Sequence, residues 1–366
     1  MAMRTASVHR VAMPDPGDAS GLDGLFAAGL LDPAAVVCIM GKTPGNGLTN
    51  DHTRELAARS VAAVLAARLG IDADAVRARV MLLFSGGTEG LLAPHLLVFA
   101  RAAAMATNDR TPSLAIGLAR SRALAPPEIG RTAQLEAALA ATRAALADAA
   151  LEDPAQAAWV QVKCPIPAPT ALAGASGLAA PDVAGIKHLS RAACALGVAA
   201  ALGDVPRAAL DAVVLGARPD LGTRRACVTA AIDSPCVEVM VLGNSASWAG
   251  DTTIGSTALA DMLDAPAVAA LLARLGLPAA PQLTEAQRAR LIGVILKGDP
   301  PPGDRLRGAR HVMHDDSDIH AFRHYRAAMG GMLGAVTGDC HVYLSGGAEH
   351  QVAPGGAALA VIVRRG

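Results

Sequence analysis

One pattern occurs three times along this 366-residue chain, and the repetition constrains the fold more than any other feature. Each copy places a serine at or just beyond the end of an apolar run and a glutamate four residues later. The copies span residues 84–89, 233–238 and 344–349. Each copy follows an earlier apolar run that ends in a lysine, and these lysines are Lys42, Lys163 and Lys297. Such a repetition predicts repeated structural units.

Each third of the chain shows the same succession of predicted elements. It runs from a helix to a strand ending in lysine, a helix bearing an arginine, a strand ending near serine and a closing strand. The arginines are Arg54, Arg191 and Arg326. A period of about 120 residues is too long for a solenoid. The succession predicts an α+β fold of three similar α+β units around a pseudo-threefold axis with a central active site.

Polar stretches separate the thirds of the chain at residues 103–112 and 251–256. They predict repeat units at residues 1–103, 112–250 and 256–366. Each unit is expected to have its own sheet and to contribute one lysine, one arginine and one serine to the central site.

Two local expectations concern helix ends. Ser190 is expected to cap a helix that runs to Leu202 and carries Arg191 in its first turn. The helical pattern over residues 259–275 contains Pro266, which is expected to split or kink that helix because proline lacks the amide hydrogen.

Composition argues against two classes of partner. Hydrophobic residues make up 52% of the chain and charged residues 17%, which is typical of a folded protein with a large core. The formal net charge is +0 and aromatic residues make up 2%, so no nucleic-acid partner is expected. The longest uncharged stretch, residues 164–181, is broken by prolines and glycine, so no membrane-spanning helix is expected.

Cysteine usage and the first residues predict the compartment. The six cysteines form no C-x-x-C pair and lie in or beside apolar runs, so they are expected to be reduced core residues. Residues 1–15 contain no apolar segment of the signal-peptide type. Both observations predict a cytoplasmic protein.

The repeated lysines and serines indicate nucleophilic chemistry at a shared cavity. A serine hydroxyl becomes a nucleophile when a base takes its proton, and a neutral lysine can be that base. Burial or nearby cations keep a lysine neutral by lowering its pKa. The Gly-Gly that follows Ser85 and Ser345 offers backbone N–H groups that can hold an oxyanion. Arginine adds fork-shaped donors that match a planar, oxygen-rich ligand.

These features predict a hydrolase and leave two questions open. The residues alone do not choose the reacting pair among Lys42/Ser85, Lys163/Ser234 and Lys297/Ser345. A non-catalytic binder of a planar anionic ring is the alternative of another class, although a binder would need no serine beside each lysine.

Seven stretches across the three thirds resemble the cyanuric acid hydrolase/barbiturase family of cyclic amide hydrolases. They are residues 41–47, 50–54, 85–90, 160–165, 190–193, 315–319 and 345–351. The resemblance implies three similar units around a pseudo-threefold axis, a central site and a homotetramer. It implies hydrolytic ring opening, most closely of cyanuric acid to carboxybiuret, which loses carbon dioxide to give biuret. Barbituric acid or a related cyclic imide is the alternative substrate.

The resemblance also implies the site residues by position. The family uses its middle pair for chemistry, which implies Lys163 as the base and Ser234 as the nucleophile. The residues implied to bind substrate are Lys42, Arg54, Ser85, Gly86, Arg191, Pro235, Lys297, Arg326, Ser345 and Gly346. Arg191 favours cyanuric acid, because barbiturases lack the arginine in the middle unit. Phe322 lies in a stretch that departs from the family pattern and is expected to influence ring specificity.

The resemblance implies no cofactor for the chemistry, but it does imply a structural magnesium or calcium ion near the last loop. The ligands would be backbone oxygens of Ala348, Gln351, Val352, Ala353 and Gly356. The family often has an acidic residue directly after the third lysine. Here Gly298 takes that position and Asp299 follows, so the sequence leaves the ion undecided.

Overall fold

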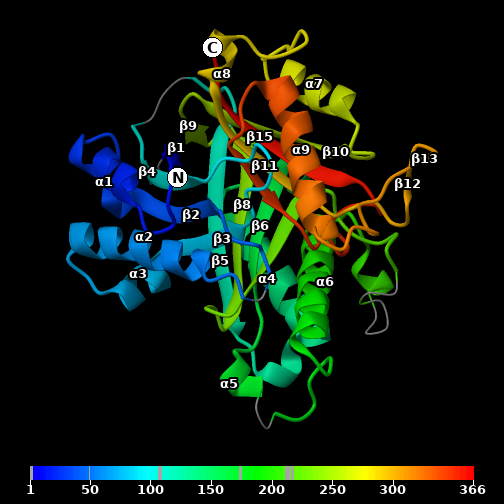
Figure 1. Cartoon of the computed structure of the whole chain (residues 1–366). Coiled ribbons are helices and arrows are strands. Elements are labelled where there is room, and N and C mark those ends of the chain that lie inside the picture. Colours follow the sequence, from blue (N-terminus) through cyan, green and yellow to red (C-terminus); the bar gives the residue numbers. More distant parts are fainter. Residues whose placement is uncertain (1–2, 49, 106–108, 173–174, 211–214, 216–217) are drawn as a thin grey trace.

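The structure of this protein is a computed structural model that describes residues 3–48, 50–105, 109–172, 175–210, 215 and 218–366. Most of the described strands form three sheets, and helices cover these sheets (Figure 1). A separate two-stranded ribbon pairs β12 (Arg305–Leu306) with β13 (Ala309–Arg310). None of the described helices is long and apolar enough to span a membrane.

Each sheet takes its four main strands from a different third of the chain. The first contains β1 (Arg4–Ala12), β2 (Val36–Thr43), β3 (Met81–Gly86), β4 (His95–Ala103) and the short β9 (Trp248–Ala249). The second contains β5 (Ser113–Ala123), β6 (Ala157–Pro165), β7 (Ala226–Ala231) and β8 (Cys236–Ser245). The third contains β10 (Thr252–Leu259), β11 (Leu291–Gly298), β14 (Val342–Ser345) and β15 (Ala357–Arg364).

The three sheets share one strand order, namely β3-β2-β4-β1, β7-β6-β8-β5 and β14-β11-β15-β10. In each sheet the strand that bears the lysine pairs in parallel with the strand that follows it, as β2 does with β3. Parallel neighbours need a crossover connection. A long helix provides it in each unit: α2 (Thr53–Leu69), α6 (Val183–Ala201) and α9 (Ala321–Thr337). The predicted α+β fold of three similar units is confirmed.

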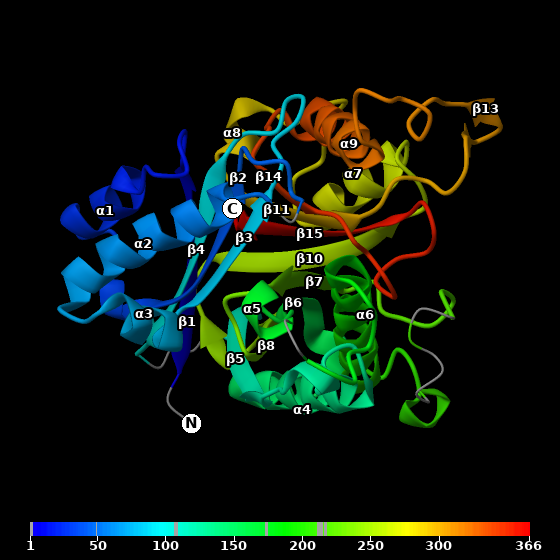
Figure 2. The same cartoon turned by 60° about the horizontal axis from the view of Figure 1, so that its bottom comes forward.

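The remaining helices complete three groups around the sheets (Figure 2). They are α1 (Ser20–Ala27), α3 (Ala73–Arg79), α4 (Thr132–Asp148), α5 (Pro169–Leu172), α7 (Ala265–Arg274) and α8 (Glu285–Arg288). Figure 2 shows α1 to α3 beside the first sheet, α4 and α6 beside the second, and α7 and α9 beside the third. The helices therefore lie at the periphery and the strands meet in the middle.

One apolar core joins the three sheets. It contains Leu83 of β3, Cys227 of β7 and Tyr343 of β14, all of which are buried. Residues two apart on a strand face the same side. Leu83 and Tyr343 therefore share a side with Ser85 and Ser345, and the common core lies directly under these serines.

The expected cap at Ser190 is wrong. Helix α6 begins seven residues earlier, at Val183, where the side chain of Asp182 accepts a hydrogen bond from the N–H of Gly185 at 2.6 Å. Aspartate is as good a cap as serine and comes first along the chain. Ser190 is instead buried in the middle of the helix, where its hydroxyl donates to the carbonyl oxygen of Pro165 at 2.7 Å.

The expected kink at Pro266 is also wrong. Residues 252–259 form strand β10, and helix α7 starts only at Ala265, so Pro266 lies in the first turn. Proline is favoured there because its missing N–H would have no partner within the helix. Strand β1 was not predicted, and it pairs with β4 along its whole length, from Arg4 opposite Ala103 to Ala12 opposite His95.

The unit boundaries remain a proposal. Strand β10 starts at Thr252, inside the stretch expected to separate the second and third units, and belongs to the third sheet. The two residues of β9 pair in parallel with β1 of the first sheet. We propose that the units follow the main sheets, so that the third unit begins with β10.

A substitution at Gly117 tests the packing of α4 on the second sheet. A Cβ at this position of β5 would lie 1.9 Å from the carbonyl oxygen of Ala145. Gly117→Ala is therefore expected to lower the free energy of unfolding by about 1–3 kcal/mol through overpacking. Gly24→Ala is the control, because nothing lies within 4 Å of a Cβ there. Urea denaturation that shows no difference between the two variants would contradict this packing.

Candidate active site

The structure brings two of the predicted lysine–serine pairs together. Lys42 and Ser85 are direct partners across β2 and β3, and Lys297 and Ser345 are partners across β11 and β14. The distance from lysine Nζ to serine Oγ is 3.3 Å in the first pair and 3.2 Å in the second. All four side chains are buried. Each pair joins a hydroxyl to an amine shielded from water.

Each of these lysines also reaches the neighbouring unit. Lys42 Nζ donates to the carbonyl oxygen of Leu344 at 2.5 Å, and Lys297 Nζ donates to that of Val228 at 2.7 Å. Burial is the main cause that lowers the pKa of both amines, well below the usual range in the case of Lys42. A buried lysine with a lowered pKa can be neutral and accept a proton.

The middle unit is arranged differently. The residue opposite Lys163, across β6 and β7, is Thr229, and Ser234 lies beyond the end of β7. The Ser234 hydroxyl donates to the carbonyl oxygen of Cys236 at 3.0 Å. Within the described chain, no hydrogen bond joins Lys163 to Ser234. In the sequence pattern, the counterpart of Ser85 and Ser345 in the middle unit is Ser234, which is followed by a glutamate at the same spacing. In the strand register, the counterpart is Thr229.

Lys163 is paired with carboxylates, unlike the other two lysines. Its Nζ donates to Asp233 Oδ2 at 2.8 Å and lies 3.5 Å from Glu238 Oε1. Asp233 also binds Arg77 of the first unit at 3.1 Å. Asp233 comes four residues after Thr229. Glu89 and Glu349 likewise come four residues after Ser85 and Ser345.

Two predicted arginines cross from one unit to the next. Arg326 donates from Nε and Nη2 to the two carboxylate oxygens of Glu89, both at 2.6 Å. Arg191 holds Glu349 in the same bidentate way, with its Nε 2.7 Å from Oε2. Paired N–H donors fix both the distance and the orientation of a carboxylate. These two ion pairs join neighbouring units.

The third arginine breaks the pattern. Arg54 Nη2 donates to the carbonyl oxygen of Leu48 at 2.7 Å, and Nε lies 3.8 Å from Asp51. In the described structure, Arg54 makes no ion pair with Asp233, the acid at the equivalent position of the middle unit. The threefold arrangement is therefore complete at two of the three junctions between units.

Sequence reasoning missed a fourth lysine. Lys187 lies on α6, one turn before Arg191, and its pKa is lowered to about 8 by burial and then by the charges of Arg191, Arg54 and Lys297. The chain has only four lysines, and the charge of Lys297 is among the causes that lower the pKa of Lys187. This scarcity was a signal that could have identified Lys187.

The glycines and Phe322 shape the site beside the serines. A Cβ on Gly346 would lie 2.8 Å from the ring of Phe322, so the ring stands directly against the residue after Ser345. A Cβ on Gly86 would meet the carboxylate of Asp51 at 1.7 Å. The structure thus places Phe322 at the site, whereas Pro235 is exposed beside Ser234.

The predicted cation site, near Gly298 and the last loop, offers backbone oxygens and no cluster of acidic side chains among the described residues. The hydroxyl of the buried Tyr325 fills the space beside Gly298, because a Cβ there would lie 2.1 Å from its oxygen. Asp299 already accepts the N–H groups of Gly347 at 2.5 Å and Ala348 at 2.6 Å. No group of three or more histidine, cysteine, aspartate or glutamate side chains able to hold a metal occurs in the described residues.

Hydrogen bonds within the chain order this last loop. The carbonyl oxygens of Ala348 and Ala353 accept the N–H groups of Gln351 and Gly356, both at 2.9 Å. The side-chain oxygen of Gln351 accepts the N–H of Val228 at 2.7 Å and ties the loop to β7. Val352 packs against the shared core.

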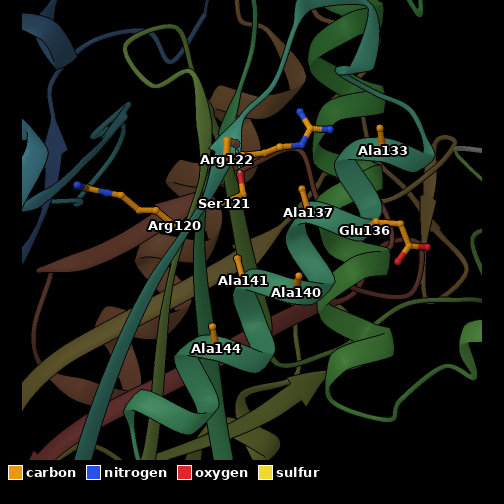
Figure 3. A pocket seen from close by; sticks show the side chains of 9 residues that line it. All are labelled: Arg120, Ser121, Arg122, Ala133, Glu136, Ala137, Ala140, Ala141 and Ala144. Carbon is orange, nitrogen blue, oxygen red and sulfur yellow. Dashed lines mark hydrogen bonds between the residues drawn. The ribbon is translucent and has the colours of Figure 1, made fainter.

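A surface pocket of about 560 Å³ lies apart from these residues, between the end of β5 and α4 (Figure 3). Five alanines of α4 line one wall, and Arg120 and Arg122 point to opposite sides of the strand. Arg120 donates to Glu238 at 2.9 Å, but the described residues that line the pocket include no lysine and none of the repeated serines.

Comparisons with known proteins match this chain end to end. A family model described as amidohydrolase ring-opening protein matches residues 7–364. A cyanuric acid amidohydrolase of Bradyrhizobium diazoefficiens is 41% identical, and the match covers 99% of each chain. A cyclic amide hydrolase of Azorhizobium caulinodans is 39% identical, over 98% of this chain and 99% of that protein.

Solved structures agree with the sequence comparison. A cyanuric acid hydrolase described as an evolutionary innovation by structural concatenation superposes with a TM-score of 0.92 at 36% identity. That match covers 99% of this chain and all of the other. The cyanuric acid hydrolase of A. caulinodans gives a TM-score of 0.87 at 39% identity, over 99% of both chains.

The bidentate pair between units predicts a stability difference between two neighbouring arginines. Arg326→Lys keeps the charge but loses the fork, so it is expected to lower the free energy of unfolding by about 1.5–3 kcal/mol. Arg323 lies 3.4 Å from the same Glu89 but is half-exposed. Arg323→Lys is expected to change stability by less than about 0.5 kcal/mol. Equal losses in chemical denaturation would contradict the buried pairing.

The lowered pKa of Lys187 predicts that replacing this lysine stabilises the protein by an amount that depends on pH. The unfolded chain keeps this proton up to a pKa near 10.5, whereas the folded chain releases it near pH 8. Below pH 8 the folded state buries a charge at a cost, and this cost falls as pH rises from 8 to 10.5. Lys187→Met is therefore expected to stabilise the protein most at pH 7 and progressively less above pH 8.

Urea denaturation at pH 7, 8.5 and 10 measures this trend. Lys187→Arg is the matched control, because arginine keeps its charge over this range and its cost should not fall with pH. A gain for Lys187→Met that stays constant across the three pH values would contradict the inferred burial.

Proposed function

Because this chain belongs to the amidohydrolase ring-opening family, we propose that it opens the ring of cyanuric acid by hydrolysis. The observation that carries the proposal is the pairing of a buried lysine with a serine hydroxyl in two units, at 3.3 Å and 3.2 Å. A ring with three equivalent amide faces suits a site assembled from three similar units.

The proposed reaction begins with attack by a side-chain hydroxyl on a ring carbonyl carbon, while a lysine amine accepts the hydroxyl proton. Cleavage of the adjacent C–N bond opens the ring, and water then releases carboxybiuret, which loses carbon dioxide to leave biuret. The family resemblance assigns the attack to the middle unit. The pairs Lys42/Ser85 and Lys297/Ser345 would then hold the other two faces of the ring.

The cations of the site support carbonyl activation. Arg191 and Arg326 each leave one guanidinium nitrogen, Nη1, outside the bidentate contact with glutamate. That nitrogen can donate to a ring oxygen and stabilise negative charge on it. The backbone N–H of Gly347 already bonds Asp299, so in the third unit this N–H is not free to hold an oxyanion.

Other parts of the proposal concern the state of the protein. The described cysteines are all free, which supports a reducing, cytoplasmic location. We include in the same proposal the homotetramer that the resemblance implies. No cofactor is assigned to the chemistry.

A ring panel tests the function. The purified protein is mixed with cyanuric acid, barbituric acid and N-methylated cyanuric acid, and ring absorbance and biuret are followed. Cyanuric acid is expected to be consumed with stoichiometric biuret, and barbituric acid much more slowly. Lys42→Met and Lys297→Met are expected to lower kcat/KM by roughly 2- to 12-fold, because each removes a hydrogen-bonding amine from the site.

Two results would overturn the proposal. Cyanuric acid that binds in calorimetry without being consumed would favour the non-catalytic binder. A protein that neither binds nor opens any ring of the panel would exclude both functions.

A further inference from the structure

We infer that His188 is a positioning residue for Arg191, because it holds Glu349 from the same helix and so fixes the guanidinium group that pairs with this glutamate. The inference rests on the proposed function and deepens it by adding a residue that sets the direction of one proposed ring donor. Two observations carry it. They are the contacts that His188 and Arg191 share, and the same arrangement of side chains around a second glutamate.

His188 and Arg191 contact one carboxylate. Both come from α6 and are three residues apart, a spacing that makes two side chains neighbours on a helix. Arg191 Nε donates to Glu349 Oε2 at 2.7 Å and its Nη2 donates to Oε1, which lies 3.0 Å from His188 Nδ1. Burial opposes ionisation of Glu349, but the charge of Arg191 outweighs it and lowers the pKa of this carboxyl. The carboxylate is therefore ionised, and His188 Nδ1 is the donor.

The third donor restricts how the ion pair can move. With the arginine fork alone, carboxylate and guanidinium can swing together about their side-chain bonds. His188 adds a contact to Oε1 from one turn earlier on the same helix, so that the carboxylate is held at two points of α6. The direction of Arg191 Nη1, which lies outside the bidentate contact, is thereby fixed relative to the helix.

The same arrangement occurs around Glu89. Arg326 donates from Nε to Oε2 and from Nη2 to Oε1, and Arg323, three residues earlier on α9, lies 3.4 Å from Oε1. The side chains of His188 and Arg323 are 48% and 50% exposed, and each glutamate side chain is 12% exposed. We call each set of one glutamate and its two basic partners a glutamate clamp. The two clamps differ in having histidine at one position and arginine at the other.

The first unit supports this assignment by contrast. Its arginine, Arg54, is bonded to a backbone carbonyl and holds no glutamate among the described residues. The residue three positions earlier is Asp51, which accepts the N–H of Gly47 at 2.8 Å. A basic residue thus occupies this position only in the two units whose arginine holds a glutamate, which assigns the position to the clamp.

Histidine makes the charge of one clamp depend on pH. Glu349 and Arg191 together carry no net charge, and a protonated His188 gives the clamp one positive charge. The clamp on Glu89 carries the same charge permanently, because both of its basic residues are arginines. Loss of the His188 proton therefore lowers the positive potential at one clamp only, and with it the attraction for an oxygen-rich ring.

The groups around His188 favour its charged form. The hydrogen bond to Glu349 is the largest cause that raises the pKa of His188 above 6.5, against burial, which lowers it. The charges of Glu349 and Asp299 raise this pKa further, and that of Arg191 lowers it. The pKa of His350, next in the loop, is lowered mainly by burial and also by the charge of His188. The effect of a charged His188 is thus complete below pH 6.5 and is lost as pH rises through the raised pKa.

Kinetics across pH test the positioning role. The kcat/KM of each variant on cyanuric acid is divided by that of the parent at the same pH, so that ionisation of the ring itself cancels. For His188→Arg, which copies the other clamp, this ratio is expected to rise from about one at pH 5.5 to about two to five at pH 8.5. His188→Gln carries no charge, and it is expected to start about two- to fivefold below the parent at pH 5.5 and to approach it at pH 8.5.

Arg323→His is the reciprocal variant. It places a histidine in the clamp on Glu89, so its ratio is expected to fall from about one at pH 5.5 to about one half to one fifth at pH 8.5. A purely structural role would change each ratio by the same factor at every pH. Melting temperatures confirm that each variant folds.

A second measurement needs no substrate. In isotope-labelled protein, the Nε–H resonance of Arg191 is expected to shift as His188 titrates, and this shift is expected to disappear in His188→Arg. The Nε–H resonance of Arg326 is the internal control and is expected not to shift, because Arg323 keeps its charge over this range. Arg191→Lys and Arg326→Lys lack these N–H groups and therefore identify the two resonances.

The outcomes separate this inference from the proposed function. A parent that opens cyanuric acid, with ratios that do not change with pH, overturns the positioning role and leaves the function in place. A parent that opens no ring overturns the proposed function, and the Arg191 resonance then decides the positioning role. A shift that follows His188 supports the role, whereas a resonance that does not move, or that moves equally in His188→Arg, overturns it.

Discussion

Two buried lysines connect the three sheets of this protein. Lys42 bonds its own strand pair and the carbonyl oxygen of Leu344 in the third sheet, and Lys297 does the same toward Val228 in the second. A buried amine is tolerated when it is hydrogen-bonded and neutral. The burial that joins the sheets therefore also lowers the pKa of the two amines and brings the hydroxyl-bearing strands together at one point.

The arginine–glutamate ion pairs form a second set of contacts between the units. These contacts do not follow the threefold arrangement at every junction. Two junctions hold a bidentate pair, whereas at the third Asp233 binds Lys163 and Arg77. Aspartate is one methylene shorter than glutamate, and Asp233 bonds within its own unit as well as across. An unequal set of junctions is compatible with the proposed reaction, in which one face of the ring reacts and two are held.

The middle unit shows that a sequence pattern and a strand register can select different residues. Ser234 and Glu238 reproduce the serine–glutamate spacing, while Thr229 and Asp233 carry the same spacing with substituted side chains. The Gly-Gly that marks the other serines is replaced by alanines at 230 and 231, so nothing local drew attention to Thr229. Strand register depends on a partner strand more than 60 residues away, which short-range pattern does not report.

The sequence by itself determined the three similar α+β units and the recurrence of lysine, arginine and serine in them, because apolar periodicity and side-chain type are local properties. Only the tertiary structure decided that Thr229 faces Lys163, that Lys187 joins the other lysines, and that Tyr325 closes the space beside Gly298. Each of these depends on which distant strand or helix packs alongside. Contacts between distant segments are set by the packing of the whole chain, and no single segment encodes them.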